Sequence, residues 1–259
     1  MITLTTGQIE GWLAAWLWPF LRIGACLMVA PIFSATFVPA RVRLVLAGAI
    51  ALAVAPLLPP LPQVSPFSGQ GLVITLQQIL IGVAIGFVLQ IVFDALAMGG
   101  QLLANTMGLS FAFNVDPLRG TGAPVVGQFY TLIATLTFLA LNGHLAIVQA
   151  LVDGFTTLPV GMDGLGAEGY WRVVSWGSAL FRGALMVALP GLTALLIVNI
   201  AFGVVSRAAP TLNLFAIGFP VTLIGGLLVM LAGLPAMQSG FVALVGETLA
   251  LVTGLLGGG

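Results

Sequence analysis

The sequence contains no lysine, one histidine and one cysteine among its 259 residues. Because a Walker A motif requires a lysine, nucleotide hydrolysis by a P-loop in this chain is excluded. The single histidine, His144, excludes both an HExxH motif and a metal site made of several histidines. The single cysteine, Cys26, excludes an intrachain disulfide, and its apolar neighbours indicate a small core residue. We therefore expect neither a metal nor a cofactor.

Charged residues are also scarce. They make up 5% of the chain, whereas roughly a quarter of the residues in a soluble domain are charged. The seven basic residues are all arginines and are balanced by seven acidic ones, so the net charge of zero gives no electrostatic support for a nucleic-acid partner. Hydrophobic residues make up 60% of the chain, and its mean hydropathy is +1.19. This composition predicts an all-α integral membrane protein.

Apolar segments long enough for a membrane-spanning helix of about twenty residues recur along the chain. Six are expected, near residues 12–31, 42–61, 72–97, 123–141, 176–201 and 216–237. Residues 241–256 are interpreted as a continuation of the last segment beyond a kink at Pro235, whereas residues 145–158 are too short for a span. Because prolines fall within or beside these runs, we expect kinked or broken helical hairpins.

The arginines alternate with the predicted spans and so indicate an orientation. Four of them follow spans one, three and five on the same side: Arg41, Arg43, Arg119 and Arg207. The positive-inside rule places that side in the cytoplasm and the N-terminus outside. The N-terminal segment lacks the basic region and cleavage pattern of a secretory signal, so we expect it to be retained.

Three polar residues, Arg22, Asp94 and Asn199, fall inside the predicted helices and are expected to be buried. A charge at a helix centre costs about 2.5–3.5 kcal/mol on insertion scales. The functional interpretation is a polar pathway or relay. The alternative is that the side chains bond to carbonyls or amides of adjacent helices, or extend to an interface.

Two glycine pairs predict close packing between helices: Gly82 with Gly86, which form a GxxxG step, and Gly225 with Gly226. The apolar run over residues 197–220 is interrupted by Asn199, Arg207, Pro210, Asn213 and Pro220. Such polar backbone is tolerated where protein or a water-filled cavity surrounds it, so this run is interpreted as a functional element.

Residues 98–122 form the most polar internal segment, which we expect to be a loop. Glycines and amides alternate there with Met107, Phe111 and Phe113, followed by the turn-forming pair Asp116 and Pro117. One interpretation is an ordinary loop whose apolar side chains fill gaps in the core. The other is an apolar constriction that seals a conduit by dewetting.

Two alternative functions are weaker. Ser110 and His144 could form the nucleophile and base of an intramembrane serine protease, but no oxyanion-forming motif or orienting partner is evident. A secondary transporter with discontinuous helices should show internal repeats, and no clear repeat is present. A GxGxxG spacing at Gly164, Gly166 and Gly169 lacks a strand that leads into a helix, so it does not indicate nucleotide binding.

Four ordered blocks together resemble the FliR/SctT family of type III export-apparatus membrane proteins. They are APIFSATFVPARVRLVLAGAIALAVAP (residues 30–56), GLSFAFNVDPLRGTGAPVVGQF (108–129), FLALNGH (138–144) and NIAFGVVSRAAPTLNLFAIGFP (199–220). The resemblance covers nearly the whole chain. It implies a non-enzymatic subunit of a flagellar export gate in the bacterial inner membrane, within the flagellar basal body.

The resemblance also implies a domain plan and partners. Residues 1–259 would form one FliR-like membrane domain, with a FliP-like portion over about residues 1–170 and a FliQ-like C-terminal hairpin over residues 171–259. FliP-like and FliQ-like subunits would complete a channel for unfolded export substrates, and a FlhB-like protein would contact its cytoplasmic side. Some apolar helices would then face sister subunits instead of membrane lipid.

The family's plug lies in the segment that matches residues 108–120. The seal assigned by this resemblance, together with its flanking Met107 and shaping turn, comprises Met107, Phe111, Phe113, Asp116 and Pro117. The loop assigned to contact with the FlhB-like partner contains Arg207, Pro210 and Asn213.

Overall fold

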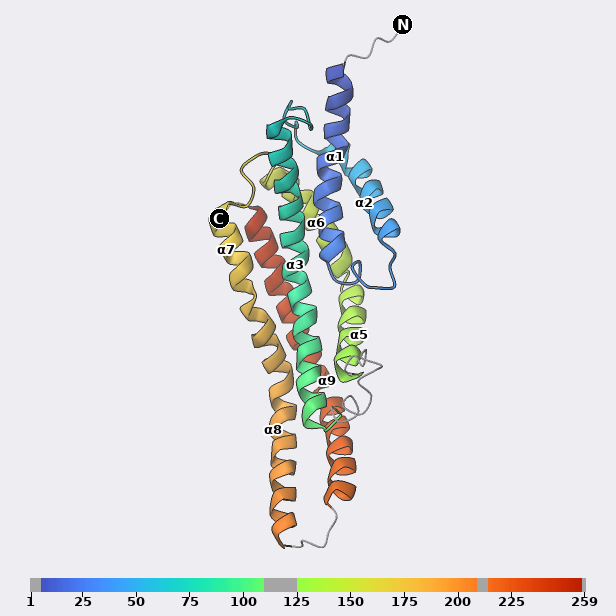
Figure 1. The fold of residues 1–259 in the computed structure, drawn as a ribbon, viewed down its shortest axis with the longest axis vertical. Coiled ribbons are helices and arrows are strands. Elements are labelled where there is room, and N and C mark those ends of the chain that lie inside the picture. The colour runs from blue at the N-terminus through green and yellow to red at the C-terminus, as the bar shows by residue number, and fades with distance from the viewer. Residues whose placement is uncertain (1–5, 110–124, 209–213, 258–259) are drawn as a thin grey trace. The chain divides into compact units, whose positions relative to one another are not determined.

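The computed structural model describes residues 6–109, 125–208 and 214–257, and every regular element in these ranges is helical. Figure 1 shows the order along the chain. The elements are α1 (Thr6–Val29), α2 (Ala40–Val54), a short 3-10 helix η1 (Ala55–Leu57), α3 (Gly69–Thr106), α5 (Val125–Ala140), α6 (Gly143–Thr157), α7 (Gly166–Trp176), α8 (Ser178–Ala208) and α9 (Leu214–Leu256). The predicted all-α fold class is confirmed.

The helices also confirm a membrane protein with about six apolar segments. In the described part of the chain, five stretches are long and apolar enough to cross a membrane, and the number is six if α5 and α6 count as one broken span. Asn142, directly before α6, adopts a left-handed conformation with φ of 56°. The break between α5 and α6 therefore falls at a residue that does not continue a right-handed helix.

Two expectations about helix ends have different outcomes. Residues 98–106 were expected to begin a polar loop, but α3 continues through them to Thr106. Glycine is a poor helix former, yet Gly99 and Gly100 lie where neighbouring helices approach too closely for a larger side chain, so packing overrides propensity. By contrast, the predicted continuation beyond Pro235 is confirmed, because α9 runs unbroken to Leu256.

The structure divides into two compact units, and each is assembled from separate stretches of sequence. The first unit contains Met1–Ile91, Asn142–Gly177 and Gly246–Gly259, and the second contains Val92–Leu141 and Ser178–Val245. Because neither unit corresponds to a single continuous stretch, the expected division near residue 170 stays a prediction.

In the first unit, α1 and α2 form an antiparallel pair over an apolar core (Figure 1). Trp18, Ile23 and Leu27 of α1 are fully buried there. The GxxxG step of α3 faces α1, where a methyl group at Gly82 would lie 2.9 Å from the Ala25 side chain. The predicted close packing at this step is thus confirmed.

In the second unit, aromatic side chains join three helices. The Phe93 ring of α3 meets Phe138 of α5 edge-on at 5.5 Å and Phe241 of α9 edge-on at 5.3 Å. Edge-to-face pairs of this kind add about 0.5–1.5 kcal/mol beyond their buried area. These ring contacts hold α5 and α9 against α3, the helix that precedes the predicted plug segment.

Candidate functional site

The buried arginine of α1 is the polar centre of the first unit. Arg22 is 0% exposed, and its Nε donates a 2.7 Å hydrogen bond to Oε1 of Gln78 on α3. Its two terminal nitrogens donate to the backbone carbonyls of Gly154 at 3.1 Å and Leu158 at 3.0 Å. The guanidinium also lies 4.2 Å from the centre of the Phe155 ring.

These partners explain how a charge is accommodated in an apolar helix. Gly154 and Leu158 lie at the C-terminal end of α6, where the helix dipole favours a cation, and the Gly154 carbonyl accepts from Arg22 in addition to the N–H of Leu158. The aromatic face of Phe155 adds a cation–π interaction. Arg22 therefore joins α1, α3 and α6. Of the two interpretations of this residue, the structure supports the one in which its side chain bonds to carbonyls and amides of adjacent helices.

The expectation that Asp94 and Asn199 are buried is wrong for the chain described here, because both are exposed. On α3, Phe93 and Ala95 face the interior, so helical geometry directs the residue between them outward. Asn199 lies on the same exposed surface of α8 as Ile200. A buried polar relay is therefore not formed by these three residues together.

The end of α3 has the geometry of a Schellman motif. Gly108 adopts φ of 80°, its N–H donates to the carbonyl of Asn105 at 3.2 Å, and the N–H of Leu109 donates to Ala104 at 3.0 Å. This pair of bonds ends a helix on a left-handed residue, for which glycine is favoured. The sequence thereby fixes the point at which the chain leaves α3 and enters the predicted plug segment.

Met107, just before this stop, is fully buried in the second unit. Gly226 of α9 leaves room for it, since a methyl group there would lie 2.7 Å from the Met107 sulfur. Gly108 faces Phe219 at the start of α9, with 3.2 Å between the ring and the position of a methyl group. The start of the plug segment is therefore anchored to α9.

The helices on both sides of the plug segment are also held together. A methyl group at Gly100 of α3 would lie 2.8 Å from the Cα of Gly127 on α5. Two glycines thus allow backbone contact between α3 and α5, which precede and follow the segment. Any side chain at Gly100 would push these helices apart.

The other predicted site residues are placed as follows. Arg207 is exposed in the last turn of α8. The residues that lie outside the described ranges are Ser110, Phe111, Phe113, Asp116, Pro117, Arg119, Pro210 and Asn213. Of the predicted seal and contact loop, the structure therefore describes Met107 and Arg207.

His144 lies in the first turn of α6, and its Nδ1 is buried without a hydrogen-bond partner in the described part of the chain. The GxGxxG glycines lie at the start of α7, where Gly164 packs against Gln77 and the Tyr170 hydroxyl donates to the same glutamine at 3.1 Å. Within the described ranges, no group of three His, Cys, Asp or Glu side chains is arranged to hold a metal.

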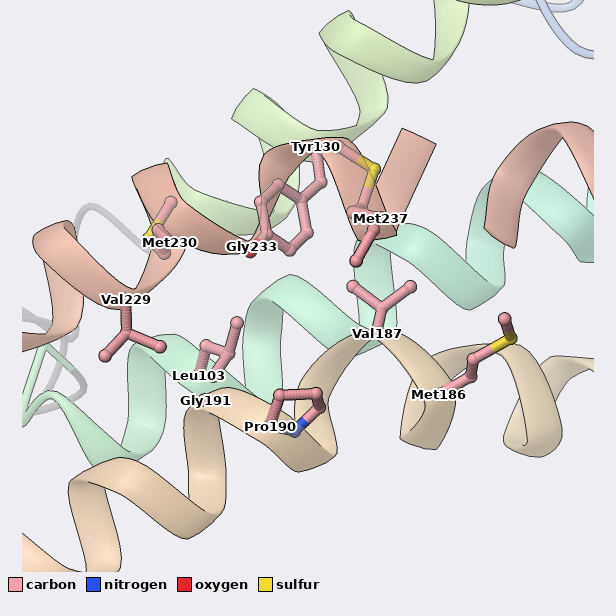
Figure 2. A pocket seen from close by; sticks show the side chains of 11 residues that line it. Leu103, Tyr130, Met186, Val187, Pro190, Gly191, Val229, Met230, Gly233 and Met237 are labelled. Atoms are coloured by element: carbon pink, nitrogen blue, oxygen red, sulfur yellow. The ribbon is translucent and has the colours of Figure 1, made fainter. Parts of the chain in front are cut away.

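An apolar pocket of about 70 Å³ lies among α3, α5, α8 and α9 of the second unit (Figure 2). Its lining contains three methionines and no charged residue: Leu103, Tyr130, Met186, Val187, Pro190, Gly191, Val229, Met230, Gly233, Ala236 and Met237. Figure 2 shows the Tyr130 ring directed from α5 toward α9. Pro190 removes one backbone hydrogen bond from α8 beside the pocket.

Sequence reasoning missed this pocket and the partners of Arg22. The pocket residues come from four helices, and their one shared signal is the frequency of methionine and glycine. Gly154 and Leu158 are 132 and 136 residues from Arg22 and act through backbone carbonyls, which carry no side-chain signature. The glycine stop at Gly108 was missed as well, although the sequence Thr-Met-Gly-Leu after a helical run is a signal that could have found it.

Comparison with known proteins gives a consistent result over almost the whole chain. The family model described as bacterial export proteins, family 1, matches residues 13–248. The chain is 43% identical over 230 residues to the flagellar biosynthetic protein FliR of Escherichia coli strain K12, covering 89% of this chain and 88% of that protein.

More distant relatives agree. The chain is 32% identical over 252 residues to FliR of Buchnera aphidicola from Schizaphis graminum, covering 97% of both chains. It is 32% identical over 223 residues to FliR of Aquifex aeolicus, covering 86% of both chains. With this coverage and with the helical fold described above, the chain belongs to the bacterial export proteins of family 1.

Proposed function

We propose that this chain is the FliR-type membrane subunit of a flagellar protein export apparatus. The observation that carries the proposal is the match to the export family over residues 13–248, together with FliR relatives at 30–43% identity. The helices long and apolar enough to cross a membrane agree with this role. The relatives are export proteins, so the chain acts by forming structure and not by catalysis.

The finer proposal is that FliP-like and FliQ-like subunits enclose a channel together with this chain. Burial supports it, because 67% of residues are buried in the most apolar stretch of α3 but 17% in those of α2, α7–α8 and α9. The outward faces of these helices are apolar, as at Val45, Ile197 and Leu231. Sister subunits and inner-membrane lipid together would cover such surfaces.

The plug segment would seal this channel until an unfolded substrate passes. Its start is held by the Schellman stop and by Met107 against Gly226. From that anchor, Phe111 and Phe113 would form a narrow apolar ring that excludes water, while Asp116 and Pro117 would shape the turn behind them. Replacing both phenylalanines with Ala should raise ion leakage through the assembled gate, and an unaltered membrane conductance would contradict the seal.

The exposed Arg207 fits a contact with a FlhB-like partner at the cytoplasmic tip between α8 and α9, with Pro210 and Asn213 in the same loop. Arg41, Arg43 and Arg207 would face the cytoplasm under the positive-inside rule. A secondary transporter is less well supported, because the apolar pocket lacks the clustered polar groups that bind a small polar solute.

Two measurements on the full chain test the proposal. In a bacterium lacking its own FliR-type protein, expression of this chain should restore flagellar export and swimming in soft agar. A tagged chain extracted in mild detergent should co-purify with FliP-like and FliQ-like subunits. If the chain restores export but elutes alone, the channel assembly is wrong; if it does not restore export although present in the membrane, the family role in this system is wrong.

The protease alternative is tested by Ser110→Ala and His144→Ala. Unchanged motility and export in both variants would remove it. Loss of export in both, with normal protein abundance, would instead favour a chemical role for the pair.

A further inference from the structure

The turn that joins α1 to α2 contains an unusual backbone conformation. Ile32 adopts φ of 71°, in the left-handed region. For a branched side chain this conformation is a steric outlier, because its Cβ substituents clash with the backbone. Such outliers persist where the surrounding structure over-determines them, and they cluster at parts that switch between conformations.

Backbone hydrogen bonds and one arginine restrain the turn. The N–H of Ser34 donates to the Ala30 carbonyl at 3.0 Å, and the N–H of Ala35 donates to the Ile32 carbonyl at 3.4 Å. The Nη2 of Arg43, on the first turn of α2, lies 3.0 Å from the Ser34 carbonyl, 2.8 Å from that of Ala35 and 2.9 Å from that of Val38. Because Nη2 carries two hydrogens, three carbonyls share two donors. The Nε of Arg43 is buried and has no hydrogen-bond partner within the described ranges. One nitrogen, Nη2 of Arg43, is therefore shared among three carbonyls of the turn, while the Nε donor of the same side chain has no partner within the described ranges.

The contact between α2 and α1 combines small residues with one hydrogen bond, in which the Trp16 Nε1–H donates to the Gly48 carbonyl at 3.5 Å. Methyl positions at Gly24 and Ala47 are 3.6 Å apart, and the Trp16 ring lies 3.6 Å from a methyl position at Gly48. Three residues of α2 are buried, and its other face exposes large apolar side chains such as Val45 and Leu52. A shift of α2 along α1 would break the Trp16–Gly48 hydrogen bond and repack these small residues.

We propose that the α1–α2 turn is a strained latch, in which Arg43 holds Ile32 in a left-handed conformation and release of that hold lets α2 move along α1. The Arg43 bonds act on carbonyls of the stretch that follows Ile32, so breaking them removes part of the restraint on the strained backbone. Two arrangements of α2 are then close in free energy, as a switching element requires.

The first test compares substitutions that differ in one methyl group. Ile32→Ala and Ile32→Gly both remove the side chain, but only glycine adopts the left-handed region freely. We expect the full-length Ile32→Gly protein to melt several degrees above Ile32→Ala in detergent, and to export more slowly because the latch no longer favours release. Equal melting temperatures would show that the strain is absent, and a higher melting temperature with equal export would show that it has no role; either result overturns the proposal.

The second test fixes α2 in the position seen here. The 3.6 Å separation of the Gly24 and Ala47 methyl positions suits a disulfide, so Gly24→Cys with Ala47→Cys should cross-link α1 to α2 on mild oxidation. We expect at least a tenfold loss of export in the oxidised double variant relative to the same protein kept reduced, and recovery after reduction. Full export by the cross-linked protein would overturn the latch. This test rests on the proposed export function, and the unmodified chain assayed in the same strain separates failure of the latch from failure of that function.

Discussion

The polar centre of the first unit and the apolar pocket of the second unit show two ways of joining helices in a very apolar chain. Around Arg22, three hydrogen bonds and an aromatic face define one geometry, because each bonded nitrogen of the guanidinium has its own acceptor. The pocket, in contrast, is lined by methionines, glycines and other apolar residues around an open volume of about 70 Å³. Directional bonds specify a single arrangement, whereas flexible thioethers and open space allow several.

The difference suggests a division of labour between the units. The Arg22 centre suits a rigid anchor for α1, α3 and α6. The second unit carries both the pocket and the fixed start of the plug segment, so adaptable packing lies in the same unit as the part proposed to open. Three substitutions test this comparison.

The largest effect is expected at the rigid centre. Arg22→Met removes three donors. The oxygens of Gln78 and Leu158 lose their bond to Arg22, at about 1–3 kcal/mol for each that stays buried and unpaired, whereas the Gly154 carbonyl keeps the N–H of Leu158. We expect the protein to be strongly destabilised, with low abundance in the membrane and an early thermal transition in detergent. Arg41→Ala, at an exposed position, is the control and should be near neutral. A stable Arg22→Met protein would remove the distinction between anchor and pocket.

An intermediate effect is expected at the end of α3. Gly108→Ala places a Cβ on a residue with φ of 80°, close to Phe219, and should cost about 1 kcal/mol or more. Gly108→Asn tolerates the left-handed conformation better and should lose less. Because the plug segment starts here, membrane conductance should rise in the Ala variant more than in the Asn variant. Equal membrane conductance in the two variants would show that the geometry of the helix stop does not affect the seal.

The smallest effect is expected inside the pocket. A methyl group at Gly233 meets no atom within 4 Å, so Gly233→Ala should be stabilising by about 0.5–1 kcal/mol through helix propensity. At Gly191, on the opposite wall, the same methyl group collides with Leu103, so Gly191→Ala should be destabilising. Thermal unfolding of the two variants measures the difference. Destabilisation by both would mean that the pocket is as tightly determined as the Arg22 centre.

Much of the fold could be predicted from the sequence because apolar length is a local property. The all-helical class, the number of spans and the continuation of α9 past Pro235 all follow from it. The end of α3 was misplaced because Gly99 and Gly100 disfavour helix locally, and only contacts with α8 and α5 explain their presence. Which way a residue faces is equally non-local, so Asp94 was expected inside and lies outside.

The candidate site divides in the same way. The signal for the helix stop at Gly108 lies in adjacent residues, whereas two acceptors of Arg22 are backbone carbonyls that only the fold brings close. The strained conformation of Ile32 had no sequence signal, since a branched residue is the least expected choice for it.

The burial of Cys26 has a practical consequence. Cys26 is fully buried, and its backbone packs against Gly86 of α3, so thiol reagents should not react with the native chain while the two helices stay together. Maleimide labelling at this single position would then report separation of α1 from α3. Introduced surface cysteines could be tagged in the same protein without removing the native one.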